Sequence, residues 1–473
     1  MFQVYTTNDI IPDGTMGVSI HSDITDLSSI KLPDSVTVIS LDGDYFRELK
    51  KVDLPPFLSE LQLCRGYNHE LCSNEFPLSL TCLDMNIFGS YNIKLTKNSL
   101  PVNLEKLTFS YKYDHDLESD VFPDTLEHLI LADKYARAIT KNSLPKYLKV
   151  LEHNFCPIIA EDDPKEIFPK SIEKISSRIK RSYGIMDGSY PTNIKCLTIS
   201  NKFINKGPLP CLRELKMPYE YFNHDPDFKI PDTVVNLCVT ECVKEINQNI
   251  FPRGLEKLSI YFSDPHAFTY NCFPPNLRYL KIHGVDRFDE NSFPRKLVGL
   301  TIDTISVDSL RSNILPSTLK SLTIAKLPEC ILDRDFLPRN LECLKITCTA
   351  GIDLSIIPDT VEYLRINFIK PFNSDFMDMQ YLPSNLKYID VRREIEFLIR
   401  ADIYPPFSVI FDGHLKLSAL NKIKFPFLVK EKRSIPRNLE IINRITHVRG
   451  KKYVTIINPE TFVPHTHTKS ARF

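Results

Sequence analysis

The sequence predicts a repeat solenoid, and three observations carry that prediction. A proline recurs about every 22 residues, an apolar residue stands directly before it, and a Leu-x-x-Leu-x-Ile pattern follows it. A fixed internal period of this length indicates a stack of similar coils rather than several separate globular domains. We therefore expect stacked short parallel β-strands on a concave face, with loops, 3₁₀ turns or second short strands on the outer face.

The prolines set the period of the chain. They are Pro12, Pro33, Pro55, Pro77, Pro101, Pro123, Pro145, Pro169, Pro191, Pro210, Pro231, Pro252, Pro274, Pro294, Pro316, Pro338, Pro358 and Pro383. The first and last of these 18 prolines lie 371 residues apart, so their 17 steps average about 22 residues. Proline locks φ and restricts the residue before it to extended backbone, so each copy predicts a corner of the chain. The preceding residue is always Leu, Ile, Phe or Tyr, which places an apolar side chain at the corner.

A short strand is expected after each corner. Residues 337–346 read Leu-Pro-Arg-Asn-Leu-Glu-Cys-Leu-Lys-Ile, and residues 251–260 are a second clear copy. The Leu-x-Ile alternation is that of a strand with one buried face. Because one coil cannot bury its own apolar side, we expect neighbouring coils to stack and share a core. The polar, variable residues that lead to the next proline are too few for a full amphipathic helix.

The unit Leu-Pro-x-x-Leu-x-x-Leu-x-Ile resembles the FNIP repeat, a leucine-rich-repeat-like unit known from slime moulds and giant viruses of amoebae. The resemblance covers about Ile11 to Val391 and rests on the number of copies. The Phe-Asn element of the family remains only at residues 222–223 and 372–373. Many members also carry an N-terminal F-box of several helices, but only residues 1–11 precede the first repeat here. The resemblance therefore implies a leucine-rich-repeat-like fold without an F-box of its own.

The period predicts two regions. Residues 1–391 are expected to form about 18 repeats, and residues 392–473 a C-terminal cap that contains a partial repeat from Ile435 to Ile442. Residues 421–473 hold seven Lys and five Arg against Glu431, Glu440 and Glu460, a net charge of +9. This basic end has two interpretations, a solvated tail or a site for RNA or another anionic partner, and we favour the first.

Composition limits the classes of function. Lys plus Arg and Asp plus Glu both number 59, so no overall field attracts nucleic acid or an anionic membrane. No run approaches the roughly 20 apolar residues of a spanning helix, and no secretion signal is present. The 12 cysteines are scattered without zinc-ligand spacing. We expect a monomer in the cytosol, or in the host-cell cytosol if the source is a virus, with no cofactor and no metal.

The sequence favours binding over catalysis. It contains no Gly-x-Ser-x-Gly elbow, no P-loop, no Gly-x-Gly-x-x-Gly and no His-Glu-x-x-His. A stack of repeats also offers an open surface rather than a pocket that excludes water. We therefore predict a non-catalytic scaffold that binds a protein partner on its concave strand face. The alternatives are nucleic-acid binding through the basic cap and a ubiquitin-ligase substrate adaptor that lacks its own F-box.

The outward strand positions are the candidate binding residues, because they flank the buried Leu and Ile of each coil. In the late coils they are Tyr279, Lys281, His283, Tyr363, Arg365, Asn367, Tyr388 and Arg392. Tyr and Arg are the residue types that dominate binding hot spots. The early coils offer a more neutral to acidic series, Ser19, Ser40, Gln62, Asp84, Thr108, Glu152, Ser176 and Thr198. The competing interpretation is an ordinary polar strand face on which Tyr is favoured by β-propensity alone.

Overall fold

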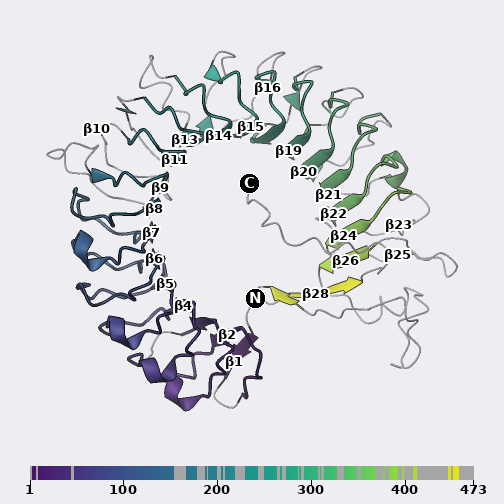
Figure 1. Ribbon diagram of the computed structural model, residues 1–473. Coiled ribbons are helices and arrows are strands. Elements are labelled where there is room, and N and C mark those ends of the chain that lie inside the picture. Colours follow the sequence, from purple (N-terminus) through teal and green to yellow (C-terminus); the bar gives the residue numbers. More distant parts are fainter. Residues whose placement is uncertain are drawn as a thin grey trace, which may run out of the picture. The chain divides into compact units, whose positions relative to one another are not determined.

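In the computed structural model the chain forms two compact units, Phe2–Thr240 and Glu241–Phe473. The structure describes residues 3–6, 9–43, 47–153, 167–177, 187–188, 190–199, 204–205, 208–218, 229–242, 250–263, 267–268, 273–285, 287–288, 292–306, 309, 314–327, 335–348, 353–368, 377–378, 383–392, 397–398, 408–412, 446–448 and 451–456. Within each unit the chain winds into coils, and each coil contributes a strand to a parallel sheet (Figure 1). The predicted solenoid of stacked parallel strands is therefore confirmed.

Among the described residues, twelve strands form the sheet of the N-terminal unit. They are β1 (Gln3–Tyr5), β2 (Gly17–Ile20), β3 (Val38–Leu41), β4 (Glu60–Gln62), β5 (Cys82–Asp84), β6 (Lys106–Thr108), β7 (His128–Ile130), β8 (Val150–His153), β9 (Lys174–Ser177), β11 (Cys196–Thr198), β13 (Glu214–Pro218) and β14 (Asn236–Cys242). Each strand pairs in parallel with the next one in this order. The pairing aligns one buried apolar residue of each coil, for example Leu83 with Leu107 and Leu107 with Leu129. This column is the core that a single coil cannot form.

The C-terminal unit repeats this arrangement with longer strands. They are β15 (Lys257–Phe262), β17 (Tyr279–His283), β19 (Gly299–Thr304), β20 (Ser321–Leu327), β21 (Cys343–Cys348), β22 (Tyr363–Phe368), β24 (Tyr388–Arg392) and β26 (Ser408–Asp412), all in parallel pairings. Two apolar columns face inward here, since Leu300 pairs with Leu322 and Ile302 with Ile324. The longer strands thus bury at least two residues per coil, including the pair that the Leu-x-Ile alternation predicts.

The parallel run continues into the region predicted as a cap. Strand β26 pairs in parallel with β24, and β28 (Lys451–Ile456) then pairs antiparallel with β26. Strand β27 (Thr446–Val448) pairs antiparallel with β28. The partial repeat at residues 435–442 lies outside the described residues, and the boundary at residue 391 stays a prediction.

In several of the described coils, the side away from the sheet carries the expected 3₁₀ turns and second short strands. The turns are η1 (Leu27–Ser29), η2 (Lys51–Asp53), η3 (Ser73–Glu75), η4 (Ser119–Val121) and η7 (Leu354–Ile356). The short strands form parallel pairs, β10 (Asp187–Gly188) with β12 (Ile204–Asn205), β16 (Ala267–Phe268) with β18 (Arg287–Phe288), and β23 (Met377–Asp378) with β25 (Phe397–Leu398).

The corners are closed by a backbone hydrogen bond. The N–H three residues after the proline donates to the proline carbonyl, as from Leu104 to Pro101 at 3.2 Å. One corner differs from the sequence prediction, because Leu212 donates to Leu209 and not to Pro210. Pro210 therefore occupies the second position of the turn, where its locked φ is equally suitable.

Side chains at the corners join one coil to the next, which the sequence analysis missed. The residue two positions after the proline donates to the backbone carbonyl of the preceding coil. Thr125 Oγ1 donates to Leu104 O at 2.8 Å, and Thr318 Oγ1 donates to Leu297 O at 2.8 Å. The same contact is made by Ser79, Ser171, Asn193 and Thr360. The pattern Pro-x-Ser/Thr/Asn-apolar therefore satisfies carbonyl groups that would otherwise lack a partner.

A second ladder lies on the side of the N-terminal unit away from the sheet. Asn68 Oδ1 accepts from the N–H of Asn92 at 2.9 Å, and Asn92 Oδ1 accepts from the N–H of Asp114 at 3.1 Å. Each of these residues follows a buried tyrosine, and the rings of Tyr91 and Tyr113 stack with centroids 6.4 Å apart. The aromatic-Asn order matches the Phe-Asn element, whose predicted copies at 222–223 and 372–373 lie outside the described residues.

Candidate binding surface on the exposed strand face

The outward side chains of β15, β17, β19, β20, β21 and β22 form one surface, which we call the exposed strand face. Its central row runs through Ser259, Lys281, Thr301, Thr323, Lys345 and Arg365, with Lys281 to Arg365 aligned strand by strand. Because Leu and Ile point into the core, every second residue of these strands faces outward. The sequence-predicted residues of β17 and β22 therefore lie on this surface.

Tyr279 is the most exposed aromatic residue of this face, with 37% of its surface accessible. Lys257 Nζ lies 5.5 Å from the ring centroid and Arg278 Cζ lies 6.0 Å from it. Gly299 pairs with Tyr279 on the next strand, and a Cβ there would lie 2.8 Å from Tyr279 Cδ1. The missing side chain thus leaves room for the ring, which two cations flank at cation–π distance.

A second cluster forms around Tyr261 and His283. Their rings stack with centroids 4.3 Å apart and an interplanar angle of 6°. Lys281 Nζ lies 5.7 Å from the Tyr261 centroid. The Nδ1 atom of His283 contacts the Asp303 carboxylate. The stack and the carboxylate hold the imidazole in a fixed orientation on the face.

The third cluster forms around Tyr363. Lys345 Nζ lies 5.6 Å and Arg365 Cζ 5.8 Å from its ring centroid. Asn367 is half-buried and pairs with Thr347 of the neighbouring strand. The structure thus brings together Tyr363 and Arg365, two of the sequence-predicted residues, and adds Lys345, which the sequence prediction left out.

The predicted residues Tyr388 and Arg392 lie on β24. Their backbones align with Tyr363 and Asn367 of β22, respectively. Their side chains lie outside the part of the chain that the structure describes, so their roles stay predictions.

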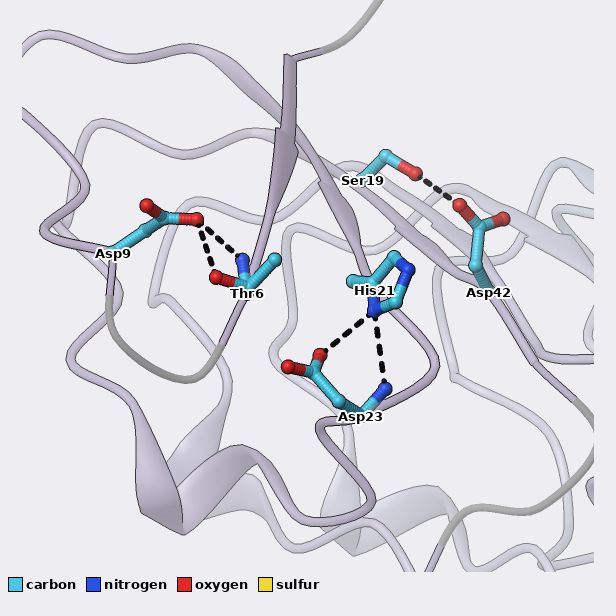
Figure 2. Close-up of polar contacts among 6 residues, drawn as sticks. All are labelled: Thr6, Asp9, Ser19, His21, Asp23 and Asp42. Atoms are coloured by element: carbon cyan, nitrogen blue, oxygen red, sulfur yellow. Dashed lines mark hydrogen bonds and ion pairs between the residues drawn. The ribbon is translucent and has the colours of Figure 1, made fainter.

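The outward side chains of the N-terminal unit contact one another. Figure 2 shows Ser19 Oγ donating to Asp42 Oδ2 at 2.7 Å, near the contacts of Thr6 with Asp9 and of His21 with Asp23. Further along the row, Ser40 Oγ donates to Gln62 Oε1 at 2.7 Å. His128 Nε2 lies 3.3 Å from Glu152 Oε1. These hydroxyl groups and carboxylates are thus engaged in contacts with other side chains of the same unit.

Exposed ion pairs border the sheets one residue before the strands. Lys149 pairs with Glu127 at 2.6 Å and Lys195 with Glu173 at 2.7 Å in the N-terminal unit. In the C-terminal unit, Lys320 pairs with Glu342 at 2.7 Å and Lys387 with Glu362 at 2.9 Å. All four pairs join successive coils. Exposed pairs of this kind contribute only about 0–1 kcal/mol each.

Metal ligation, thiol chemistry and membrane insertion each depend on a specific arrangement of the described residues. No group of three or more His, Cys, Asp or Glu side chains among them is arranged to hold a metal ion. Burial raises the pKa of the Cys82 thiol, and it raises the pKa of Cys196 to about 11, so both thiols are protonated at neutral pH. Within the described part of the chain, no helix combines the length and apolar character needed to traverse a bilayer.

Comparison with known proteins identifies the repeat. The FNIP Repeat family model matches residues 91–134, a segment that includes Tyr91, Tyr113 and the hydrogen bond between Asn92 and Asp114. No curated protein matches the chain. Leucine-rich-repeat proteins are among its structural neighbours.

Two solved structures illustrate that likeness. CroV588, described as a novel circular LRR protein, shares 21% sequence identity at a TM-score of 0.46, over 84% of this chain and 57% of its own. The chain therefore spans less than two thirds of the length of CroV588. YopM from Yersinia enterocolitica shares 18% identity at a TM-score of 0.34, over 79% of this chain and 78% of its own.

Proposed function

We propose that this protein is a non-catalytic protein-interaction scaffold and that its exposed strand face binds the partner. The supporting observation is the set of three tyrosine rings, Tyr261, Tyr279 and Tyr363, each with a Lys or Arg about 6 Å or less from its centroid. Repeat solenoids present extended surfaces of this kind. Tyr and Arg are also the side chains that contribute most binding energy at protein interfaces.

The clusters are suited to binding because their side chains are held before a partner arrives. Lys257 lies over Tyr279, and Lys345 and Arg365 lie against Tyr363. Ordering a free Lys or Arg side chain at an interface costs about 0.5–1.5 kcal/mol. Contacts that already restrict these side chains reduce that cost. The proposed scaffold acts as a monomer in the cytosol, or in the host-cell cytosol if the source is a virus.

Site-specific photo-crosslinking in cells of the natural source tests the location of binding. A photoreactive phenylalanine derivative replaces Thr323, which is half-exposed in the centre of the face, or Ser176, which is half-exposed at the corresponding position of β9. We expect a protein adduct of defined mass from position 323 and none from position 176. The double variant Tyr363→Ala/Arg365→Glu should abolish the adduct at position 323.

Three results would contradict the proposal. They are an adduct that persists in the double variant, an adduct that forms only at position 176, and an adduct that disappears after nuclease treatment. The last result would support the alternative of nucleic-acid binding.

A further inference from the structure

The central row of the exposed strand face contains hydrogen-bond donors and no carboxylate over five successive strands. From β17 to β22 it consists of Lys281, Thr301, Thr323, Lys345 and Arg365. All five side chains are half-exposed. Lys and Arg only donate hydrogen bonds, and a Thr hydroxyl donates one. The row therefore complements a ligand rich in acceptors.

Three carboxylates that border this row are already engaged. Asp303 contacts His283, Glu342 pairs with Lys320, and Glu362 pairs with Lys387. Among the described residues, Lys281 and Lys345 contact tyrosine rings and form no ion pair. The positive charges of Lys281 and Lys345 are thus directed to the surface and not neutralised by an ion pair among the described residues.

The spacing of the row sets the length of a matching ligand. Neighbouring strands lie about 4.8 Å apart, so the four steps from Lys281 to Arg365 span about 19 Å. An extended peptide advances about 3.3 Å per residue, so about six residues cover that distance. Lys281 and Lys345 are three strand steps, or about 14 Å, apart, which corresponds to a separation of four to five peptide residues.

We propose that the exposed strand face binds an extended acidic segment of a protein partner, about six residues long, that crosses β17 to β22. One carboxylate of the segment pairs with Lys281, and a second, four or five residues away, pairs with Lys345 and Arg365. Thr301 and Thr323 donate to the peptide carbonyls between them. Tyr279 and Tyr363 flank the segment on one side. This inference rests on the proposed function and specifies the chemistry of the partner.

Fluorescence anisotropy with the full chain tests the inference. The labelled probe is Glu-Ser-Gly-Ser-Glu-Glu, and the matched controls carry Gln in place of Glu, or all three Glu at one end. We expect the spaced acidic peptide to bind at least tenfold more tightly than either control. Affinity should fall as salt concentration rises, because the contacts are between charges near the surface.

Variants distinguish binding of the peptide to this row from its nonspecific attraction to Lys and Arg elsewhere on the chain. Lys345→Glu/Arg365→Glu should weaken binding of the acidic probe at least tenfold. Lys216→Glu alters an exposed central position of β13 in the N-terminal unit and should leave the affinity unchanged. Circular dichroism of each variant establishes that the fold is retained.

The inference is overturned if the double variant binds the acidic probe as tightly as the original chain, or if single-stranded oligonucleotide binds more tightly than the peptide. Weak, equal binding of all three peptides also overturns it. If the photo-crosslink at position 323 still forms in that case, the proposed function stands and only the acidic chemistry of the partner is wrong. If the crosslink is absent as well, both proposals fail.

Discussion

The hydroxyl group of Tyr113 provides a direct test of the second ladder of the N-terminal unit, in which buried tyrosines precede Asn68, Asn92 and Asp114. Tyr113 is 1% exposed, its ring packs on Phe109 with centroids 4.3 Å apart, and its Oη accepts from the Leu95 N–H at 3.4 Å. Burial raises the pKa of Tyr113 to about 12, so the hydroxyl stays protonated at neutral pH. Tyr113→Phe keeps the ring and leaves the buried Leu95 N–H without its acceptor.

The expected loss follows from the cost of an unsatisfied buried donor. A buried N–H that loses its partner costs about 1–3 kcal/mol, and the 3.4 Å separation places this one toward the lower end. A loss of about 1–2 kcal/mol corresponds to a five- to thirtyfold change in an opening equilibrium. The amide of Leu95 and its neighbours should therefore exchange hydrogen five- to thirtyfold faster in the variant.

Hydrogen exchange followed by mass spectrometry measures this locally, which suits a repeat array whose unfolding need not be two-state. The matched control is Tyr111→Phe, which makes the same chemical change at a half-exposed tyrosine two residues away. Unchanged exchange at Leu95 in Tyr113→Phe would refute the role given to the hydroxyl. An equal effect of Tyr111→Phe would show that the effect is not specific to the ladder.

Two further predictions concern stability. Leu107→Ala truncates a fully buried residue that pairs between Leu83 and Leu129, so urea denaturation should show a loss of about 2–5 kcal/mol, against less than about 0.5 kcal/mol for Val102→Ala at an exposed corner. Burial lowers the pKa of His153 to about 4, so the unfolded chain binds more protons than the folded one between that value and the ordinary pKa of about 6.5. Stability should therefore fall as the pH drops through this window, by at most about 3 kcal/mol, and His153→Gln should flatten this part of the curve measured by urea denaturation. Equal stability of both leucine and valine variants, or an unchanged pH dependence in His153→Gln, would contradict these predictions.

The fold could be predicted from the sequence because its main signals are local and repeated. The Leu-x-Ile alternation fixes which side chains point inward, and the proline fixes where each coil turns. Leu300 and Ile302 are buried, while Thr301 between them faces outward. The assignment of Tyr279, Lys281 and His283 to one exposed surface followed from the same alternation.

The contacts between coils could not be read in the same way. The hydrogen bond from Thr125 to Leu104 O joins residues 21 apart. Its only sign in the sequence is that Ser, Thr or Asn often stands two residues after the proline. Pro210 shows a related limit. An apolar residue precedes it, as at the other corner prolines, but Leu209 and not Pro210 is the first residue of the turn. Lys345 stands between Leu344 and Ile346, so the alternation does place it on the outward side, but its contact with Tyr363 depends on the register of two strands, which the repeat period sets only approximately.

A charge exchange across the interface tests the central claim most directly. The chain carrying Lys345→Glu/Arg365→Glu is titrated with the acidic probe and with its counterpart Glu-Ser-Gly-Ser-Lys-Lys. If the last two peptide residues contact positions 345 and 365, the variant should lose affinity for the first peptide and gain affinity for the second, while the original chain shows the opposite preference. A variant that binds the two peptides with the same preference as the original chain would contradict the account.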